Sequence, residues 1–119
     1  MITHESIDLD TSDAAVVRVR YVQMDDDIDM GGELVIDRAT VPYLVEQVDA
    51  CANVYPYPQT SAKVGTDELR IYASGSDQMP IVNVINRRPE GGKAGGLYGL
   101  MLTVPYAQRL VGLLRALRN

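Results

Sequence analysis

Apolar and polar residues alternate along several short segments of this chain, which is the pattern of a strand with one buried face. In the segment AVVRVRYV (15–22), Val17, Val19 and Tyr21 fall on one side, and Arg18 and Arg20 fall on the other. Four further segments, separated by turn residues, are also predicted to be strands. They are ELVID (33–37), DELRIYAS (67–74), PIVNVIN (80–86) and LYGLMLTV (97–104). The last is apolar almost throughout, which favours burial on both of its faces.

Two segments instead show the three- and four-residue spacing of an amphipathic helix, one from about 41 to 53 and one from about 104 to 118. The apolar positions are Leu44, Val45, Val48, Cys51 and Ala52 in the first, and Ala107, Leu110, Val111, Leu114 and Leu117 in the second. Each helix begins at the tetrapeptide TVPY, at 40–43 and at 103–106. Thr followed by Pro suits a helix start, because the Thr oxygen can accept a hydrogen bond from a free N–H group of the first turn.

The repeated tetrapeptide raises the hypothesis of an internal duplication. Each TVPY follows a short strand, a Gly-Gly pair, a charged loop and an earlier strand, so residues 15–52 are predicted to superpose on 80–117. The whole pattern predicts an α+β fold, with about five mostly antiparallel strands in the order ββα-β-ββα and two helices packed on one face. Residues 1–14 are expected to form a flexible N-terminal tail, and 15–119 a single α+β domain.

Composition narrows the class of protein. With 119 residues, 46% apolar and 23% charged, the chain has the make-up of a folded domain. A net charge of −5 makes nucleic acid an unlikely partner, because binding to phosphate backbones relies on a surplus of Lys and Arg. The sequence has neither a long apolar run nor a signal-peptide pattern, which predicts a cytoplasmic protein without membrane contact.

Candidate chemistry is sparse. The chain has one cysteine, Cys51, and one histidine, His4, which stands in the polar N-terminal segment. A Cys–His or Ser–His nucleophile needs a histidine beside it, and a zinc site needs several Cys or His ligands. One cysteine and one remote histidine supply neither. We therefore expect no enzymatic activity and no cofactor.

The acidic segment DDDIDMGGE (25–33) places Asp25, Asp27 and Asp29 at alternate positions, where carboxylates could converge on a cation such as calcium. The EF-hand pattern needs Gly at its sixth position and Glu at its twelfth, which are Met30 and Ile36 here. A solvated hairpin tip is the alternative, and whether a cation binds is left open.

A second loop, at 87–96, carries Arg87, Arg88 and Lys93 among glycines. Successive backbone N–H groups in such a loop can bind an anion, although Lys93 lacks the following Ser or Thr of a P-loop. A hairpin connection is the alternative. Because the two loops carry opposite charges, they could also dock copies of the chain head to tail, or contact oppositely charged patches on another protein.

Tyr55 and Tyr57 flank Pro56 in an extended segment, where rigid aromatic side chains suit an interface. Three functions follow from these features. The first is a non-enzymatic protein-binding module that occupies a partner's surface, as inhibitors, immunity proteins or phage-encoded anti-defence proteins do. The second is a small ligand-, metal- or phosphate-binding domain that uses the loops 25–33 and 87–96, and the third is a self-assembling structural subunit. The partner-binding residues expected for the first function are Tyr55, Tyr57, Asp25, Asp27, Asp29, Arg87, Arg88 and Lys93.

Overall fold

The fold is known from a computed structural model, which describes residues 1–53, 60–76, 79–91 and 94–117. The strands are β1 (Ile2–Asp10), β2 (Val16–Asp25), β3 (Ile28–Asp29), β4 (Gly32–Asp37), β5 (Thr60–Val64), β6 (Asp67–Ser76), β7 (Met79–Arg88) and β8 (Gly96–Thr103). The helices are the short 3-10 turn η1 (Arg38–Thr40), α1 (Val41–Asn53) and α2 (Val104–Arg115).

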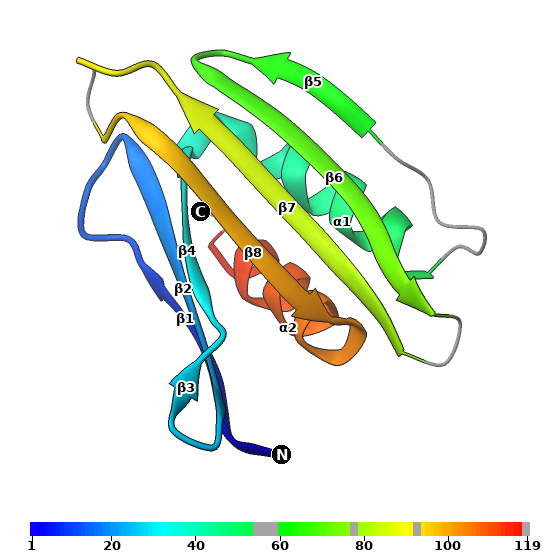
Figure 1. Ribbon diagram of the computed structural model, residues 1–119. Coiled ribbons are helices and arrows are strands. Elements are labelled where there is room, and N and C mark those ends of the chain that lie inside the picture. The colour runs from blue at the N-terminus through cyan, green and yellow to red at the C-terminus, as the bar shows by residue number, and fades with distance from the viewer. Residues whose placement is uncertain (54–59, 77–78, 92–93, 118–119) are drawn as a thin grey trace.

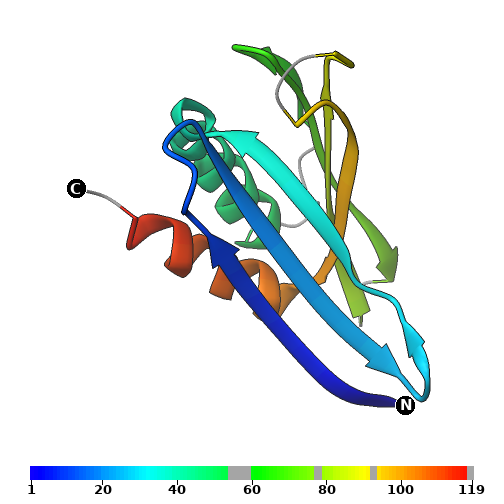
Figure 2. The ribbon, with the colours of Figure 1, turned by 90° about the vertical axis from the view of Figure 1, so that its left-hand side faces the viewer.

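The strands form one antiparallel sheet in the order β1-β2-β4-β8-β7-β6-β5, with β3 paired to β2. Both long helices lie against the same face of this sheet (Figures 1 and 2). The opposite face, toward the viewer in Figure 1, carries no helix from the described part of the chain. None of the helices in the described ranges has the length and apolar composition needed to cross a lipid bilayer.

The junction between β4 and β8 joins two parts of the sheet. Only Glu33 and Gly99 are paired there, whereas β2 with β4 and β7 with β8 are paired along most of their lengths. Figure 2 shows that β1, β2 and β4 turn away from the remaining strands, so that the sheet wraps around the helices. Glycine is required at Gly32, because a Cβ atom there would lie 2.3 Å from the carbonyl oxygen of Gly99.

The core lies between the sheet and the two helices. Alternate side chains of the strands face it, including Val19 of β2, Ile36 of β4 and Val84 of β7. The helices contribute the apolar positions that their spacing predicts, with Leu44 of α1 and Leu110 of α2 fully buried. The predicted limits 41–53 of the first helix are confirmed, and the second helix ends at Arg115.

The predicted strand count of about five is too low, since the described residues form an eight-stranded sheet. The largest difference is at the N-terminus, where the expected flexible tail contains the nine-residue strand β1. β1 pairs with β2 from Ile2 to Asp10, and it turns Ile7 and Leu9 toward the core. The segment ITHESIDLD has too few apolar residues to indicate a strand by itself. The segment forms a strand by pairing with β2, and the sequence of the segment does not indicate this pairing.

The structure does not support an internal duplication. The two TVPY segments begin helices, but their threonines differ in role. Thr40 ends η1 and is buried, and its hydroxyl donates a hydrogen bond to Asp67 Oδ2 at 2.7 Å. Thr103 is the N-cap residue of α2 and makes no side-chain capping bond. The Thr40 hydroxyl thus contacts another strand, which the prediction of a helix cap did not anticipate.

Candidate protein-binding surface

The face of the sheet opposite the helices carries rows of side chains that run across neighbouring strands. Residues directly opposite one another in an antiparallel pair point to the same face. One row joins Tyr72 of β6, Asn83 of β7 and Met101 of β8. The next row joins Arg70, Ile85 and Gly99, and the third joins Lys63, Glu68, Arg87 and Leu97.

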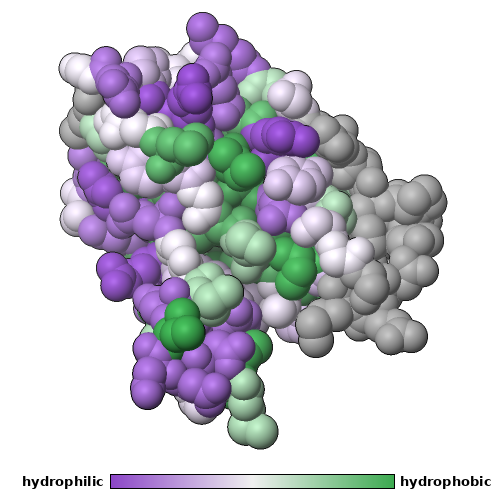
Figure 3. Space-filling model, viewed as in Figure 1, coloured by the Kyte–Doolittle hydropathy of each residue, from purple (hydrophilic) through white to green (hydrophobic). Residues whose placement is uncertain are grey.

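Large apolar side chains are exposed in these rows. Leu97 is 67% exposed and Met101 is 60% exposed, and Met30, between β3 and β4, is 54% exposed. We call this surface the open face and define it by Met30, Tyr72, Ile85, Leu97 and Met101. Figure 3 shows apolar side chains gathered along the middle of this side of the molecule. Contiguous exposed apolar surface of this kind marks interaction sites in soluble proteins.

This arrangement corrects the prediction that β8 is buried on both faces. Leu100 and Leu102 are buried against the helices, but Leu97 and Met101 point away from them. The segment LYGLMLT is apolar at both alternating sets of positions, so its sequence does not distinguish the core side from the exposed side. The difference depends on whether a second layer covers the strand.

The centre of the open face is a shallow depression of about 370 Å³, lined by all five residues that define this surface. Gly99 forms part of its floor, and a Cβ atom at Gly99 would meet nothing closer than 3.7 Å. Asn83 also lines the depression, and its Nδ2 donates to Ser74 Oγ at 2.9 Å and to the Tyr72 carbonyl at 3.3 Å. The Asn83 amide is thereby held by hydrogen bonds within its own sheet.

The acidic hairpin tip lies beside β2 and β3. A two-residue turn at Asp26 and Asp27 joins these strands, and Asp26 has a positive φ of 55°, which Asp tolerates better than most residues. Asp25 Oδ1 lies 2.6 Å from the amino group of Met1, and Asp29 Oδ1 accepts a hydrogen bond from the Gly31 N–H at 2.8 Å. The described residues contain no group of three or more His, Cys, Asp or Glu side chains placed to hold a metal ion.

The other end of the open face is more basic. Arg87 is exposed on β7, opposite Glu68, and Lys63 of β5 is exposed on the far side of Glu68. The Arg70 guanidinium lies 4.6 Å from the centre of the Tyr72 ring, which is a cation–π contact at the border of the apolar surface.

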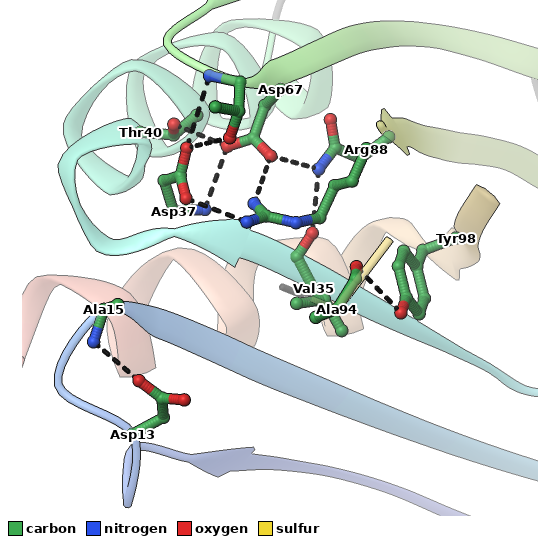
Figure 4. A network of polar contacts seen from close by, with 11 residues as sticks. Asp13, Ala15, Val35, Asp37, Thr40, Asp67, Arg88, Ala94 and Tyr98 are labelled. Atoms are coloured by element: carbon green, nitrogen blue, oxygen red, sulfur yellow. Dashed lines mark hydrogen bonds and ion pairs between the residues drawn. The ribbon is translucent and has the colours of Figure 1, made fainter. Parts of the chain in front are cut away.

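Arg88 departs from the prediction, because it is buried rather than exposed in a loop. β7 continues through Arg88, and the alternation of the strand turns this side chain inward. Figure 4 shows Arg88 between two carboxylates: Nη1 lies 2.5 Å from Asp67 Oδ1, and Nη2 lies 3.0 Å from Asp37 Oδ1. Arg88 thus holds the fold together at this edge and presents no guanidinium to a partner.

Asp67 is the centre of this buried network. Its Oδ2 accepts hydrogen bonds from the Asp37 N–H at 2.9 Å and from the Thr40 hydroxyl, and its Oδ1 also accepts one from Asn86 Nδ2 at 2.8 Å. Asn86 Nδ2 donates in addition to the Val35 carbonyl at 2.8 Å. These contacts join β4, β6 and β7 where β4 turns into the first helix (Figure 4).

The network shifts the pKa values of its outer members. Burial alone would lower the pKa of Arg88, but the hydrogen bond with Asp37 and the charge of Asp67 outweigh it and raise that pKa. Burial would raise the pKa of Asp37, but hydrogen bonds from Thr66 and Arg88 outweigh it and lower that pKa. Both shifts favour the charged state of the pair.

Ala94 and Gly95, just before β8, contact residues of both neighbouring segments. Tyr98 donates its hydroxyl to the Ala94 carbonyl at 3.1 Å (Figure 4). Gly95 approaches Pro89 so closely that a Cβ atom would lie 2.3 Å from the Pro89 carbonyl oxygen. Lys93, Tyr55 and Tyr57 lie outside the described residues, so their predicted roles remain predictions. The nucleophile candidates do not meet, because Cys51 is buried in α1, where burial raises its pKa, and His4 is exposed on β1.

A second depression, of about 460 Å³, lies on the helix side of the molecule. Its lining includes Val41, Val45, Leu114 and Leu117, with Arg38 at its border. Arg38 is already bonded to the carbonyl oxygens of Thr11, Asp13 and Ala14, so this arginine fastens the β1–β2 connection. Arg38 therefore has a structural role at this rim, and Arg115, which also lines the depression, is paired with Asp49 Oδ2 at 3.4 Å.

Comparisons with known proteins add no family to this picture. The sequence matches no protein-family model, and no curated protein sequence is significantly similar to it.

Proposed function

We propose that this chain is a small non-enzymatic protein-binding module and that the open face is its binding surface. The observation that supports the proposal is the exposure of Leu97 and Met101 on either side of Gly99, on the sheet face that carries no helix from the described residues. Burying a Leu or Met side chain is worth about 1.5–3 kcal/mol, so covering this surface is a source of binding free energy.

The shape of the surface favours a protein partner over a small ligand. Small-molecule sites are usually concave and enclose most of their ligand, whereas the depression around Gly99 is shallow and borders a broad sheet face. Its apolar middle and charged border match the anatomy of protein interfaces, in which aromatic residues, Met and Arg are enriched. The net charge of −5 is also unfavourable for nucleic acid.

A module of this kind acts by covering part of its partner, which is how inhibitors and immunity proteins work. Tyr72 and Ile85 are half-buried on paired strands of the sheet, and Leu97 and Met101 are exposed. A few large anchors near the centre of such an interface usually supply most of the affinity.

Site-specific photo-crosslinking tests the proposal. A photoreactive amino acid placed at Leu97 or at Met101 is expected to crosslink the chain to a defined protein in cells that naturally produce it. The matched control is the same amino acid at Gly112, which is exposed on α2 with no atom within 4 Å of an added Cβ. A covalent adduct with one protein at both sheet positions, and none at position 112, is the expected result.

The apolar contact itself is tested by substitution. Leu97→Lys and Met101→Lys are expected to remove the adduct formed from the other position, while Gly112→Lys leaves it unchanged. Equal crosslinking from the sheet and helix positions, or no adduct from either sheet position, would contradict the proposal.

A further inference from the structure

We infer that the depression over Gly99 binds the indole ring of a tryptophan side chain of the partner, and that Asn83 Oδ1 accepts a hydrogen bond from the indole N–H. This inference rests on the proposed function, because it names the chemistry that the open face recognises. It is supported by the free acceptor of a nearly buried amide in a depression lined mainly by apolar side chains.

The Asn83 side chain is held in one orientation. The residue is only 5% exposed, and Nδ2 donates to the backbone carbonyls of Tyr72 and Ile81 at 3.3 and 3.4 Å. It also donates to Ser74 Oγ at 2.9 Å. Exchanging the two ends of the amide would place Oδ1 against two carbonyl oxygens, which cannot donate. The hydrogen bonds therefore fix Nδ2 on the side of β6 and of its own strand.

The oxygen of the same amide points the other way. Oδ1 and Nδ2 diverge from one carbon, so Oδ1 lies away from Tyr72 and Ser74 and toward β8, on which Met101 is paired with Asn83. No described residue donates a hydrogen bond to Oδ1, and this oxygen remains accessible to solvent. Covering an acceptor without giving it a donor costs free energy. A partner that binds over Asn83 therefore has to supply a donor.

Gly99 leaves room for a ring beside this acceptor. A Cβ atom at Gly99 would meet nothing closer than 3.7 Å, so the surrounding sheet does not require a glycine at this position. Glycine weakens the interior of a strand, and it often marks a place where a ligand approaches the backbone. The exposed Leu97 and Met101 are the next outward residues of β8, and apolar side chains gather along this side of the molecule (Figure 3). The space above Gly99 is thus bordered by apolar groups.

These features together select an aromatic ring that carries one donor. An aliphatic side chain would leave Oδ1 unpaired, and a charged one would lose its water among Leu97 and Met101. A tyrosine hydroxyl is both donor and acceptor, whereas the indole N–H only donates, which matches a lone acceptor. Tryptophan is also enriched among the residues that dominate interface affinity. The chain itself contains no tryptophan, so the ring belongs to a different protein.

A nuclear magnetic resonance titration of the full chain tests the indole site. The probes are N-acetyltryptophanamide and its 1-methylindole counterpart, in which a methyl group replaces the N–H hydrogen. The first probe is expected to shift the resonances of the Gly99 N–H and of the Asn83 side-chain amide. Methylation should weaken binding about three- to tenfold, the net effect of one hydrogen bond. Equal affinity for the two probes, or shifts confined to the helix layer, would overturn the inference.

Two substitutions locate the ring. Gly99→Leu should abolish the shifts, because the new side chain occupies the space above the strand. The matched control Gly112→Leu, on α2, should leave the affinity for N-acetyltryptophanamide unchanged. Asn83→Leu removes the acceptor at similar size and should bring the two probes to equal affinity; a variant that still discriminates between them would show that Asn83 is not the acceptor. Amide spectra verify the fold of each variant, and the comparison of probes on the unchanged chain needs no variant.

The crosslinked adducts identify the source of the ring. Adducts formed from positions 97 and 101 are expected to map to a partner segment that contains tryptophan. A chain that forms these adducts but binds neither probe, or whose adducts map to a segment without tryptophan, overturns the indole site and leaves the proposed binding function intact. The absence of any adduct from either position contradicts the proposed function, and with it a tryptophan supplied by a partner, whatever the probes show.

Discussion

Arg88 Nη1 and Asp67 Oδ1 lie 2.5 Å apart, and their side chains are only 6% and 0% exposed. Glu68 pairs with Arg87, so Asp67 and Arg88 occupy the next opposed positions of β6 and β7, on the face toward the helices. Asp67 also accepts hydrogen bonds from the Asp37 N–H and the Thr40 hydroxyl. This pair consequently joins two strands of the sheet to the start of the first helix.

The first prediction is that Asp67→Asn lowers the free energy of unfolding by about 3–5 kcal/mol, because removing one partner leaves a buried charge insufficiently compensated. Urea unfolding measures the change. Arg88→Met should cost a similar amount, and the double variant should lose clearly less than the sum of the two. Additive losses would show that the two side chains do not stabilise each other.

The second prediction concerns acid stability. The pKa of Asp37 is lowered, since hydrogen bonds from Thr66 and Arg88 outweigh the opposing effect of burial. The unfolded chain therefore binds this proton more readily than the folded chain does. Asp37 contributes stability that is present above its unfolded-state pKa of 3.8 and is lost as pH falls through its lower folded-state pKa.

Urea unfolding between about pH 6 and about pH 2 measures this contribution. Asp37→Asn should lower stability at neutral pH and should make stability fall less steeply in acid. Asp27→Asn, at the exposed hairpin tip, is the control for loss of a carboxylate. The same acid slope in Asp37→Asn and in the unchanged chain would contradict the assignment.

The third prediction compares Gly31, just before β4, with Gly99 in β8. A Cβ atom at Gly31 would lie 2.0 Å from the Tyr21 carbonyl oxygen, whereas one at Gly99 would find its nearest neighbour at 3.7 Å. Gly31→Ala should therefore destabilise the fold by about 1–3 kcal/mol or more, as overpacking does. Gly99→Ala should change stability by no more than about 0.5 kcal/mol. Similar thermal midpoints for the two variants would contradict the close approach of β2 to Gly31.

The fourth prediction concerns Tyr21. Burial raises the pKa of Tyr21, and its hydrogen bond to Glu5 raises it further. A raised pKa means that the folded state favours the neutral phenol more than the unfolded state does. The stability that Tyr21 contributes in this way is fully present below its unfolded-state pKa of 10.0 and is lost as pH rises toward its folded-state pKa.

Ultraviolet titration of tyrosinate should show Tyr21 ionising together with unfolding rather than before it. Tyr21→Phe should remove this alkaline component and, by losing one hydrogen bond, lower stability at neutral pH by about 1 kcal/mol. Tyr106, whose ring centre lies 5.7 Å from that of Tyr21, supplies the control variant Tyr106→Phe. An unchanged titration curve in Tyr21→Phe would contradict the prediction.

The local pattern of the sequence determines most of the elements. The helix at 41–53 follows from the spacing of Leu44 and Val48 and from Pro42 at its start, which are properties of adjacent residues. The strands around Val19, Ile36, Ile71 and Val84 follow from alternation and from the turns between them. The two-layer α+β class and the placement of both helices on one face are consequences of these amphipathic patterns.

The tertiary structure determines which strands pair at the edges of the sheet and which side chains on its faces are covered. β1 is a strand because β2 offers an unpaired edge to it, and a polar segment such as ITHESIDLD contains no local signal for that pairing. Arg88 is buried because the register of β6 and β7 places Asp67 opposite it, although Arg87 beside it is exposed. Leu97 and Met101 form a candidate binding surface because both helices lie on the other side of β8. Alternation separates the two faces of a strand, but only the packing of distant elements determines which face is covered, since burial depends on contacts between residues far apart in the chain.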